Sequence, residues 1–352
     1  MLPPVVTLAR NAMATRFELV LHGEHAVALR AAGEAALDEV DRLENQLSLY
    51  RPGSEIAQLN ARAAREAVRV TPELFALLQR AQQLHSETGG AFDITVAPLV
   101  RCWGFMSGCQ GARSDKSDGA DGGWHPPAGV PSAEAVAAAR ANVGLEQLRL
   151  NSPDRTVRFA REGVMLDLGA IGKGYAVERA AEILRAAGVK SALLHGGTST
   201  VCAIGSPPGA ESWKVAIEQP PAGVWSSAFT QSEVVEPPEG GIPNELPGSL
   251  PLRDAALSVS AVWGRSFEAE GKTFGHVIDP RTGWPVENAM LAAVVLGSAT
   301  ETDALSTALL TLGRAGLDGM AKLRPGLRAL VVSRETGKPS VARHGFPDSA
   351  GP

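Results

Sequence analysis

Residues 26–47 carry apolar side chains at helical spacing and predict a long amphipathic helix. A second helix is predicted from Thr71, which can cap its N-terminus, with Pro72 in the first turn and Glu87 at the end. A strand is predicted ahead of both helices, at Phe17–Leu21. The first part of the chain therefore combines strand and helix.

Short apolar runs bounded by turn residues predict strands in the rest of the chain. These runs lie at 148–150, 156–159, 191–195, 200–204, 213–218, 266–270 and 273–278. The first two runs form one predicted hairpin, and the last two form another around Gly271. Runs of strands next to hairpins and helices favour an α+β fold over regular winding of alternating strands and helices.

Two segments rich in Gly, Pro and Ser interrupt this pattern. Residues 107–131 and 219–251 lack apolar periodicity, and loops of this length are uncommon inside compact domains. We expect 107–131 to be a mobile loop or excursion, and 219–251 to be an excursion that is either disordered or functional. The end of the chain, residues 341–352, is expected to be a frayed tail.

The composition excludes two classes of function. The 352 residues carry a formal net charge of −5 and only 5% aromatic residues, so nucleic acid is offered neither a basic surface nor many stacking side chains. No apolar run approaches the length of about 18 residues that a membrane-spanning helix needs, so no membrane span is expected.

Residues 164–179, VMLDLGAIGKGYAVER, predict a strand, a glycine turn and a helix. Such a turn can hold an anion at the helix N-terminus, with Lys173 beside it. The glycine spacing fits neither a Walker A loop nor the dinucleotide fingerprint. On these residues alone, a phosphate site and a tight strand–helix connection are both open.

Asp303, Ser306 and Thr307 share one face of a helix predicted over 302–313, because they lie at i, i+3 and i+4. One carboxylate and two hydroxyls offer only oxygen ligands, which suits Mg²⁺. The alternative is a helix whose serine and threonine hydroxyls bond back to backbone carbonyls.

Seven motifs in a fixed order give the most specific signal in the chain. In chain order they are Met13-Ala14-Thr15, a block over 48–60, GGAFDITVAPLVRCWG (89–104), LDLGAIGKGYAVE (166–178), GGTSTVCAIG (196–205), HVIDPRTG (276–283) and DALSTALLTLG (303–313). Their order and spelling resemble the ApbE family, the FAD:protein FMN transferases, and the resemblance runs from about residue 10 to about residue 335.

The resemblance implies a single ApbE-like domain over residues 1–340, with two lobes as an alternative. Its fold would be T-fold-like, with mixed, mainly antiparallel sheets and flanking helices. The implied activity is a Mg²⁺-dependent transfer of FMN from FAD to a Ser or Thr hydroxyl of an acceptor protein, with release of AMP. The acceptor is expected to be a redox protein that carries a Ser/Thr flavinylation motif.

The resemblance also assigns residues to the site. The metal ligands would be Asp303, Ser306, Thr307 and the Ala170 carbonyl. The residues that contact FAD would be Met13, Tyr50, Ala91, Phe92, Asp93, Asp167, Lys173 and Val277. His276 is the candidate catalytic base, since an imidazole titrates near neutral pH. The alternative is a structural histidine that holds the turn at 279–283.

The chain departs from the family pattern at three points. Thr198 stands where the family has an aspartate, Ala14 where it often has a glycine, and Val259-Ser260-Ala261 where it has Thr-Ser-Gly. None of these departures removes a predicted metal ligand, but they could alter flavin affinity, the acceptor or activity itself.

Two other functions stay open on the sequence. One is an FAD pyrophosphatase that uses water in place of the acceptor and yields FMN and AMP. The other is a non-catalytic flavin-binding protein. Many relatives are exported lipoproteins, but no signal peptide or lipid-acceptor cysteine is seen near this N-terminus, so a cytoplasmic location is expected.

Overall fold

A large antiparallel sheet forms the centre of the computed structural model, which describes residues 4–106, 127, 129–217, 249–287, 289–335 and 338–346. Every hydrogen-bonded pair of neighbouring strands in it is antiparallel. Across the sheet the strands are β1 (Val5–Ala12), β2 (Thr15–His22), β6 (Ser191–Gly196), β7 (Thr200–Ile204), β10 (Ala255–Ala261), β13 (Ala289–Leu296), β14 (Arg328–Glu335) and β15 (Lys338–His344).

Smaller sheets surround this centre. One has three strands, in the order β3 (Val68–Arg69), β5 (Thr156–Phe159) and β4 (Leu148–Asn151). A second pairs β8 (Trp213–Val215) with β9 (Leu250–Leu252), and a third pairs β11 (Ser266–Ala269) with β12 (Lys272–Gly275). The hairpins predicted at 148–159 and 266–278 are confirmed by the β4–β5 and β11–β12 pairs.

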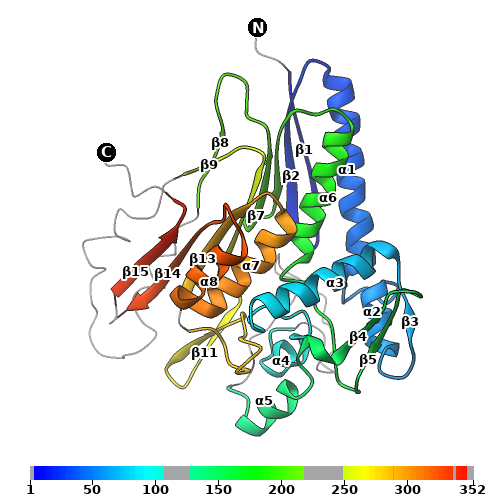
Figure 1. Cartoon of the computed structure of the whole chain (residues 1–352), viewed down its shortest axis with the longest axis vertical. Helices are drawn as coiled ribbons and strands as arrows, with labels where there is room; N and C mark the ends of the chain where they lie inside the picture. The colour runs from blue at the N-terminus through cyan, green and yellow to red at the C-terminus, as the bar shows by residue number, and fades with distance from the viewer. Residues whose placement is uncertain are drawn as a thin grey trace.

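Helices cover one face of the central sheet (Figure 1). The helices are α1 (Ala26–Leu47), α2 (Glu55–Arg62), α3 (Pro72–Glu87), α4 (Ala97–Cys102), α5 (Ala133–Arg140), α6 (Gly172–Ala186), α7 (Ala299–Leu312) and α8 (Leu317–Leu323), with 3₁₀ turns at Leu145–Gln147 and Gly313–Gly316. Of these, α1, α6, α7 and α8 contact the sheet, and α6 contacts both α1 and α7. The opposite face carries a separate apolar cluster that includes Trp213 and Val215 of β8 and Leu252 of β9.

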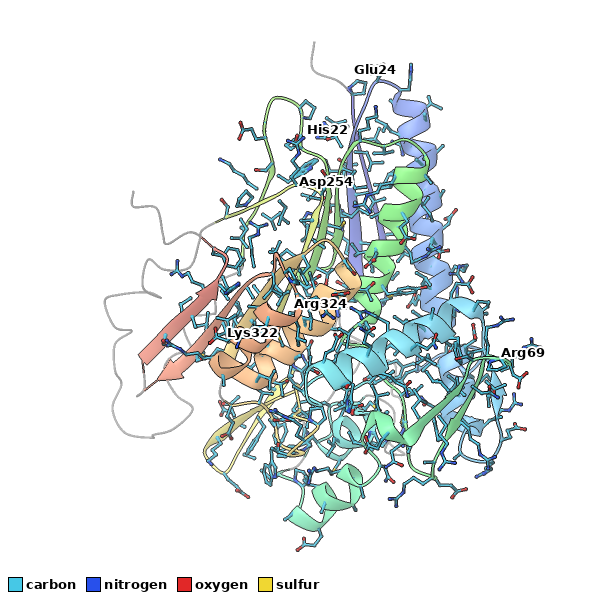
Figure 2. All side chains as sticks on the ribbon, in the orientation of Figure 1. His22, Glu24, Arg69, Asp254, Lys322 and Arg324 are labelled. Atoms are coloured by element: carbon cyan, nitrogen blue, oxygen red, sulfur yellow. The ribbon has the colours of Figure 1, made fainter. Side chains whose placement is uncertain are left out.

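Ion pairs fix the helices that lie beside the sheet. Arg324, labelled in Figure 2, comes directly after α8. It donates to Glu301 of α7 at 2.6 Å and also to Glu87 at the end of α3. Arg80 of α3 pairs with the same Glu301. These ion pairs join α3, α7 and the end of α8 at one point. Their side chains are largely shielded from water, which strengthens charged hydrogen bonds.

The predicted helices are confirmed, and α3 begins as expected, since Thr71 accepts a hydrogen bond from the Leu74 amide. The predicted α+β class and mainly antiparallel sheets are confirmed as well. The strand predicted at Phe17–Leu21 lies within β2, but it is not the first strand. β1 precedes it and was not predicted, because Arg10 and Asn11 interrupt its apolar pattern.

Two strand predictions near the site are wrong. Residues 164–168 are in no sheet; this extended segment is held by the Asn60 side chain, which bonds both backbone groups of Leu166, and by the Ile94 carbonyl, which accepts from the Asp167 amide. The strand predicted over 273–278 ends at Gly275, so His276 follows β12 rather than lying on it.

The predicted tail and excursions are only partly within the described residues. Residues 341–344 pair with β14 as part of β15, so a frayed tail does not begin at 341. Most of the predicted 107–131 and 219–251 excursions lies outside the described residues, as do 347–352. A single domain over 1–340 stays a prediction. In the part of the chain that is described, no helix is long and apolar enough to cross a membrane.

Candidate functional site

The N-terminal ends of α6 and α7 are capped by each other's carboxylates. Asp303 of α7 accepts a hydrogen bond from the Gly174 amide in the first turn of α6, with 2.8 Å between Oδ2 and N. Glu178 of α6 accepts from the Ser298 hydroxyl at 2.6 Å and the Thr300 amide at 2.8 Å, at the start of α7. Amides in the first turn of a helix have no carbonyl partner within that helix. Asp303 accepts the hydrogen bond of one such amide and Glu178 that of the other, and each carboxylate also faces the positive end of a helix dipole.

Gly174 makes this arrangement possible. A Cβ atom there would lie 2.2 Å from the Ala299 carbonyl oxygen and 2.6 Å from Cβ of Asp303, so no larger residue fits without moving a helix. The glycine-rich turn therefore serves close packing, which was one of its two predicted roles. The same packing fixes the Asp303 carboxylate at a defined place.

That carboxylate lines a cavity of ≈ 650 Å³ between α6, α7, the ends of β7 and β10, and the 91–93 segment. Among the predicted site residues, those that line the cavity are Tyr50, Ala91, Phe92, Asp93, Asp167, Ala170, Lys173, His276, Val277, Asp303 and Thr307. They come from segments far apart in the sequence, and the fold brings them together at one place. A cavity of this size suits a nucleotide-sized ligand.

Lys173 and Asp167 form one wall of the cavity. The Lys173 ammonium donates to the Gly169 carbonyl at 3.1 Å, and Asp167 accepts from the Gly169 amide at 2.8 Å. Burial raises the pKa of Asp167, while the Gly169 amide and the Lys173 charge oppose this shift. This wall places one cation at the cavity beside a carboxyl that gains a proton more readily than usual.

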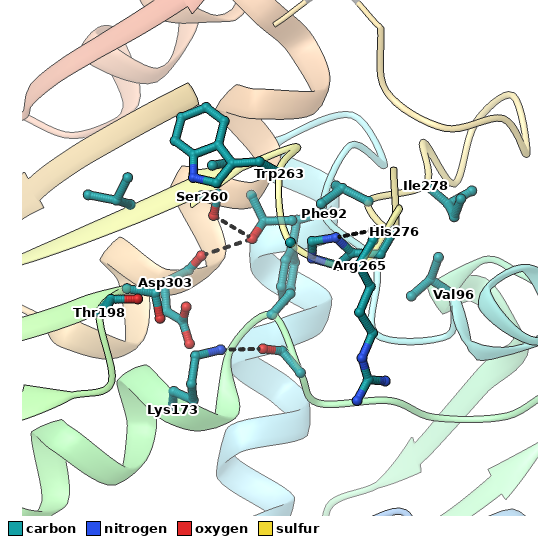
Figure 3. Close-up of a pocket in the computed structure, with 18 of the residues that line it drawn as sticks. Phe92, Val96, Lys173, Thr198, Ser260, Trp263, Arg265, His276, Ile278 and Asp303 are labelled. Carbon is teal, nitrogen blue, oxygen red and sulfur yellow. Dashed lines mark hydrogen bonds between the residues drawn. The ribbon is translucent and has the colours of Figure 1, made fainter. Parts of the chain in front are cut away.

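His276 faces the cavity with its imidazole held by the backbone (Figure 3). Its Nδ1 lies 3.2 Å from the Arg265 carbonyl oxygen, which also accepts from the His276 amide at 3.1 Å. Because a carbonyl can only accept, Nδ1 carries the proton and Nε2 is left as an acceptor. Burial lowers the pKa of His276, against the hydrogen bond to Arg265, and the Arg265 and Lys173 charges lower it further. The imidazole is therefore neutral at neutral pH, as a general base must be.

The other predicted role of His276 was to hold the turn at 279–283. That turn is closed by its own residues, since Asp279 accepts from the Arg281 amide and guanidinium and from the Gly283 amide through its carbonyl. The contacts of His276 are to Arg265 instead.

A cluster of hydroxyls lies beneath Asp303, between α7 and β10. The Ser260 oxygen lies 2.8 Å from Oγ of Ser306 and 3.1 Å from Oγ1 of Thr307. Ser306 and Thr307 also donate to the Asp303 carbonyl, at 3.0 and 3.3 Å, which is the back-bonding that the alternative to a metal site predicted. Of the two, Thr307 lines the cavity, whereas Ser306 is fully buried and does not.

These oxygens fit a divalent cation such as Mg²⁺ at the cavity wall. Asp303 has one oxygen bonded to Gly174, and its Oδ1 has no hydrogen-bond partner in the described part of the chain. Thr307 and Ala170 line the same cavity. Among the described residues no three His, Cys, Asp or Glu side chains gather as metal ligands, so the candidate set consists of the Asp303 carboxylate with hydroxyl and carbonyl oxygens. Such a set suits Mg²⁺, which is often bound by one or two carboxylates together with water and substrate phosphates.

Three predicted residues are placed differently from the rest. Met13 packs against the main core in the β1–β2 turn and is not among the residues that line the cavity. Ser306 is turned toward Ser260, as described above. Asp93 lines the cavity but is already engaged, since it accepts from the Thr95 amide and hydroxyl and lies 3.1 Å from Nδ1 of His85. The predicted roles of all three stay predictions.

The sequence reasoning missed several residues that line the cavity. Arg265 and Trp263 follow β10, Ser260 lies on it, and Thr198 lies in the β6–β7 turn. In the sequence, Thr198 marks a departure from one family motif, and Ser260 is the serine that remains of another. Arg265 had no motif to mark it, and only the fold shows that it shares a cavity with Lys173.

The sequence profile of the ApbE family matches residues 13–331. The chain therefore belongs to the ApbE family, which confirms the predicted resemblance.

Named relatives and solved structures agree with this assignment. An FAD:protein FMN transferase of Klebsiella pneumoniae (strain 342) is 30% identical over 293 residues, which cover 82% of this chain and 72% of the relative. The FAD:protein FMN transferase of Escherichia coli (strain K12) is 25% identical over 334 residues, or 94% and 85% of the two chains. The apo crystal structure of the Pseudomonas stutzeri flavinyl transferase ApbE superposes with a TM-score of 0.74 at 26% identity, covering 98% of this chain and 96% of that one.

Proposed function

We propose that this chain is an FAD:protein FMN transferase that moves FMN from FAD to a Ser or Thr hydroxyl of an acceptor protein and releases AMP. Flavin transfer as the activity, and an enzyme of this class, are supported by the names of the relatives and by the match to a flavinyl transferase structure. The observation that carries the proposal is that Lys173, His276 and the Asp303–Thr307 pair line one cavity.

Mg²⁺ is the metal that we propose for this site, and it would be held by Asp303, Thr307 and the Ala170 carbonyl. When bound, a divalent cation offsets the charge that builds up on the phosphates as the pyrophosphate bond breaks. The packing of Asp303 against Gly174 sets the position of its carboxylate before any ligand binds, so little reorganisation is needed.

The remaining groups would bind and align the reactants. Lys173 would contact the diphosphate of FAD, and Tyr50, Phe92 and Val277 would contact its rings. The acceptor hydroxyl oxygen would bond to the FMN phosphorus while the bond from that phosphorus to the AMP oxygen breaks. Nε2 of His276 would take the hydroxyl proton, because its Nδ1 is already occupied by the Arg265 carbonyl.

Two other functions are alternatives to the transferase, and one experiment distinguishes all three. A pyrophosphatase would use water in place of the acceptor hydroxyl at the same cavity, and a non-catalytic protein would bind FAD without turnover. The Asp303 and Thr307 side chains at the cavity weigh against the non-catalytic protein. The acceptor, a redox protein with a Ser/Thr motif, and the cytoplasmic location stay proposals.

The experiment incubates the purified protein with FAD and Mg²⁺, with and without a candidate acceptor segment, and separates the nucleotides by chromatography. A transferase yields AMP in proportion to flavinylated acceptor, with little free FMN. AMP and free FMN in equal amounts, whether or not acceptor is present, would favour the pyrophosphatase. Binding of FAD without AMP would favour the non-catalytic protein.

A further inference from the structure

Arg265 brings a second cation to the cavity, on a different wall from Lys173. It lies between β10 and β11, and Figure 3 shows its side chain and that of Lys173 coming from separate segments. Its Nη1 donates a long hydrogen bond of 3.4 Å to the Phe105 carbonyl. Among the described residues this is the one hydrogen bond of the guanidinium, and the side chain lines the cavity.

The charges that line the cavity explain why a second cation matters. Asp93, Asp167 and Asp303 line it alongside Lys173. A diphosphate carries two negative charges, and Lys173 is outnumbered by these three aspartates among the charged side chains of the cavity. A guanidinium reduces this repulsion, and its planar fork of donors matches two phosphate oxygens at once.

The two cations also lie close to the candidate base. Burial lowers the pKa of His276 most, and the positive charges of Arg265 and Lys173 both lower it further. His276, Arg265 and Lys173 all line the same cavity. The diphosphate and the base would therefore occupy neighbouring positions, as the transfer reaction requires.

We propose that the Arg265 side chain binds the diphosphate of FAD opposite Lys173, so that this residue selects phosphorylated flavins. The inference rests on the proposed function, since it assumes that FAD is the ligand of this cavity. The backbone carbonyl of Arg265 holds His276, and a side-chain substitution leaves that contact in place.

The test measures binding of FAD and of riboflavin, which lacks the diphosphate, by fluorescence titration. In Arg265→Met we expect FAD affinity to fall by about tenfold, as for a lost charged hydrogen bond, while riboflavin affinity changes less than about twofold. Arg265→Lys should restore part of the loss. Lys322→Met, which removes an exposed lysine on α8 that is not among the residues lining the cavity, is the matched control (Figure 2).

A second readout separates direct binding from general loosening of the site. Because the Arg265 charge lowers the pKa of His276, the acid limb of the turnover–pH profile should move to higher pH in Arg265→Met and stay in place in Lys322→Met. Wild-type affinity for FAD in Arg265→Met, or an equal loss of FAD and riboflavin affinity, would overturn the inference alone. A wild-type protein that binds FAD no more tightly than riboflavin would overturn the phosphate site of the proposed function as well.

Discussion

Gly174 and Asp303 are packed so closely that the carboxylate of one helix is bonded to the backbone of the other. The distance from the Gly174 amide nitrogen to Oδ2 of Asp303 is 2.8 Å, and the space for a Cβ atom at Gly174 is already taken by α7. The position of the candidate metal ligand therefore depends on a glycine of the neighbouring helix.

Gly174→Ala should destabilise the protein and reduce its activity together. We expect a loss of about 1–3 kcal/mol, since an added methyl group must push α7 away from α6. Gly319→Ala is the matched control, because Gly319 also lies in a helix, α8, with open space around its Cβ position, and should be neutral or stabilising. Urea unfolding measures both; equal effects of the two substitutions would contradict the packing argument.

Asp303→Asn should abolish Mg²⁺-dependent turnover while the protein stays folded. The amide oxygen can still accept from Gly174, but the charge that holds the cation is gone, so we expect activity to fall by at least about a hundredfold. The control is Asp318→Asn on the exposed surface of α8. A Mg²⁺ titration in which Asp303→Asn matches the wild type would show that the metal site is elsewhere.

The hydroxyls of Ser306 and Thr307 should differ in their effect on the metal. Thr307→Ala should raise the Mg²⁺ concentration needed for half-maximal turnover, because Thr307 lines the cavity. Ser306→Ala should change it less, since that hydroxyl faces Ser260 and the Asp303 carbonyl within the protein. The reverse order of effects would mean that Ser306 is the direct ligand.

The contact between His85 and Asp93 should make stability depend on pH. Burial lowers the pKa of His85, but the hydrogen bond and charge of Asp93, the Phe92 carbonyl and the charge of Glu146 outweigh it, so the pKa is raised above 6.5. The stabilisation is therefore complete below about pH 6.5 and is lost as pH rises through the higher folded-state pKa. His85 and Arg281 both line a second, separate cavity, and the charge of Arg281 is paired with Asp279.

Thermal unfolding across pH 5–9 tests this linkage. His85→Asn keeps a donor near Asp93 but cannot be protonated, so its stability should vary less with pH than that of the wild type over the upper part of this range. Parallel pH curves for the two proteins would show that His85 does not carry the dependence.

Ala14→Gly should stabilise the fold. Met13 and Ala14 form the two-residue turn between β1 and β2 with positive φ values of 51° and 56°, a conformation that favours glycine. We expect a gain of about 0.5–1 kcal/mol, whereas Ala12→Gly, in β1 with ordinary backbone geometry, should destabilise. A loss of stability in Ala14→Gly would mean that the turn is not strained.

The long helices and the family could be predicted from the sequence, because periodicity and motif order are local properties of the chain. The extended segment at 164–168 was misread as a strand, since its partners are the Asn60 side chain and the Ile94 carbonyl rather than another strand. Helical spacing correctly placed Ser306 and Thr307 on one side of α7, but it could not show that Ser260 of β10 covers Ser306. Arg265 was missed because only the fold brings it near Lys173.

The most direct test of the account is the mass of an acceptor protein co-expressed with this chain. We predict an acceptor whose mass increases by that of FMN joined through its phosphate, minus water, at one Ser or Thr side chain. The adduct should be absent with Asp303→Asn, reduced with His276→Ala and unchanged with Asp318→Asn. An unmodified acceptor, with AMP and free FMN accumulating in the presence of the wild-type chain, would contradict the transferase account.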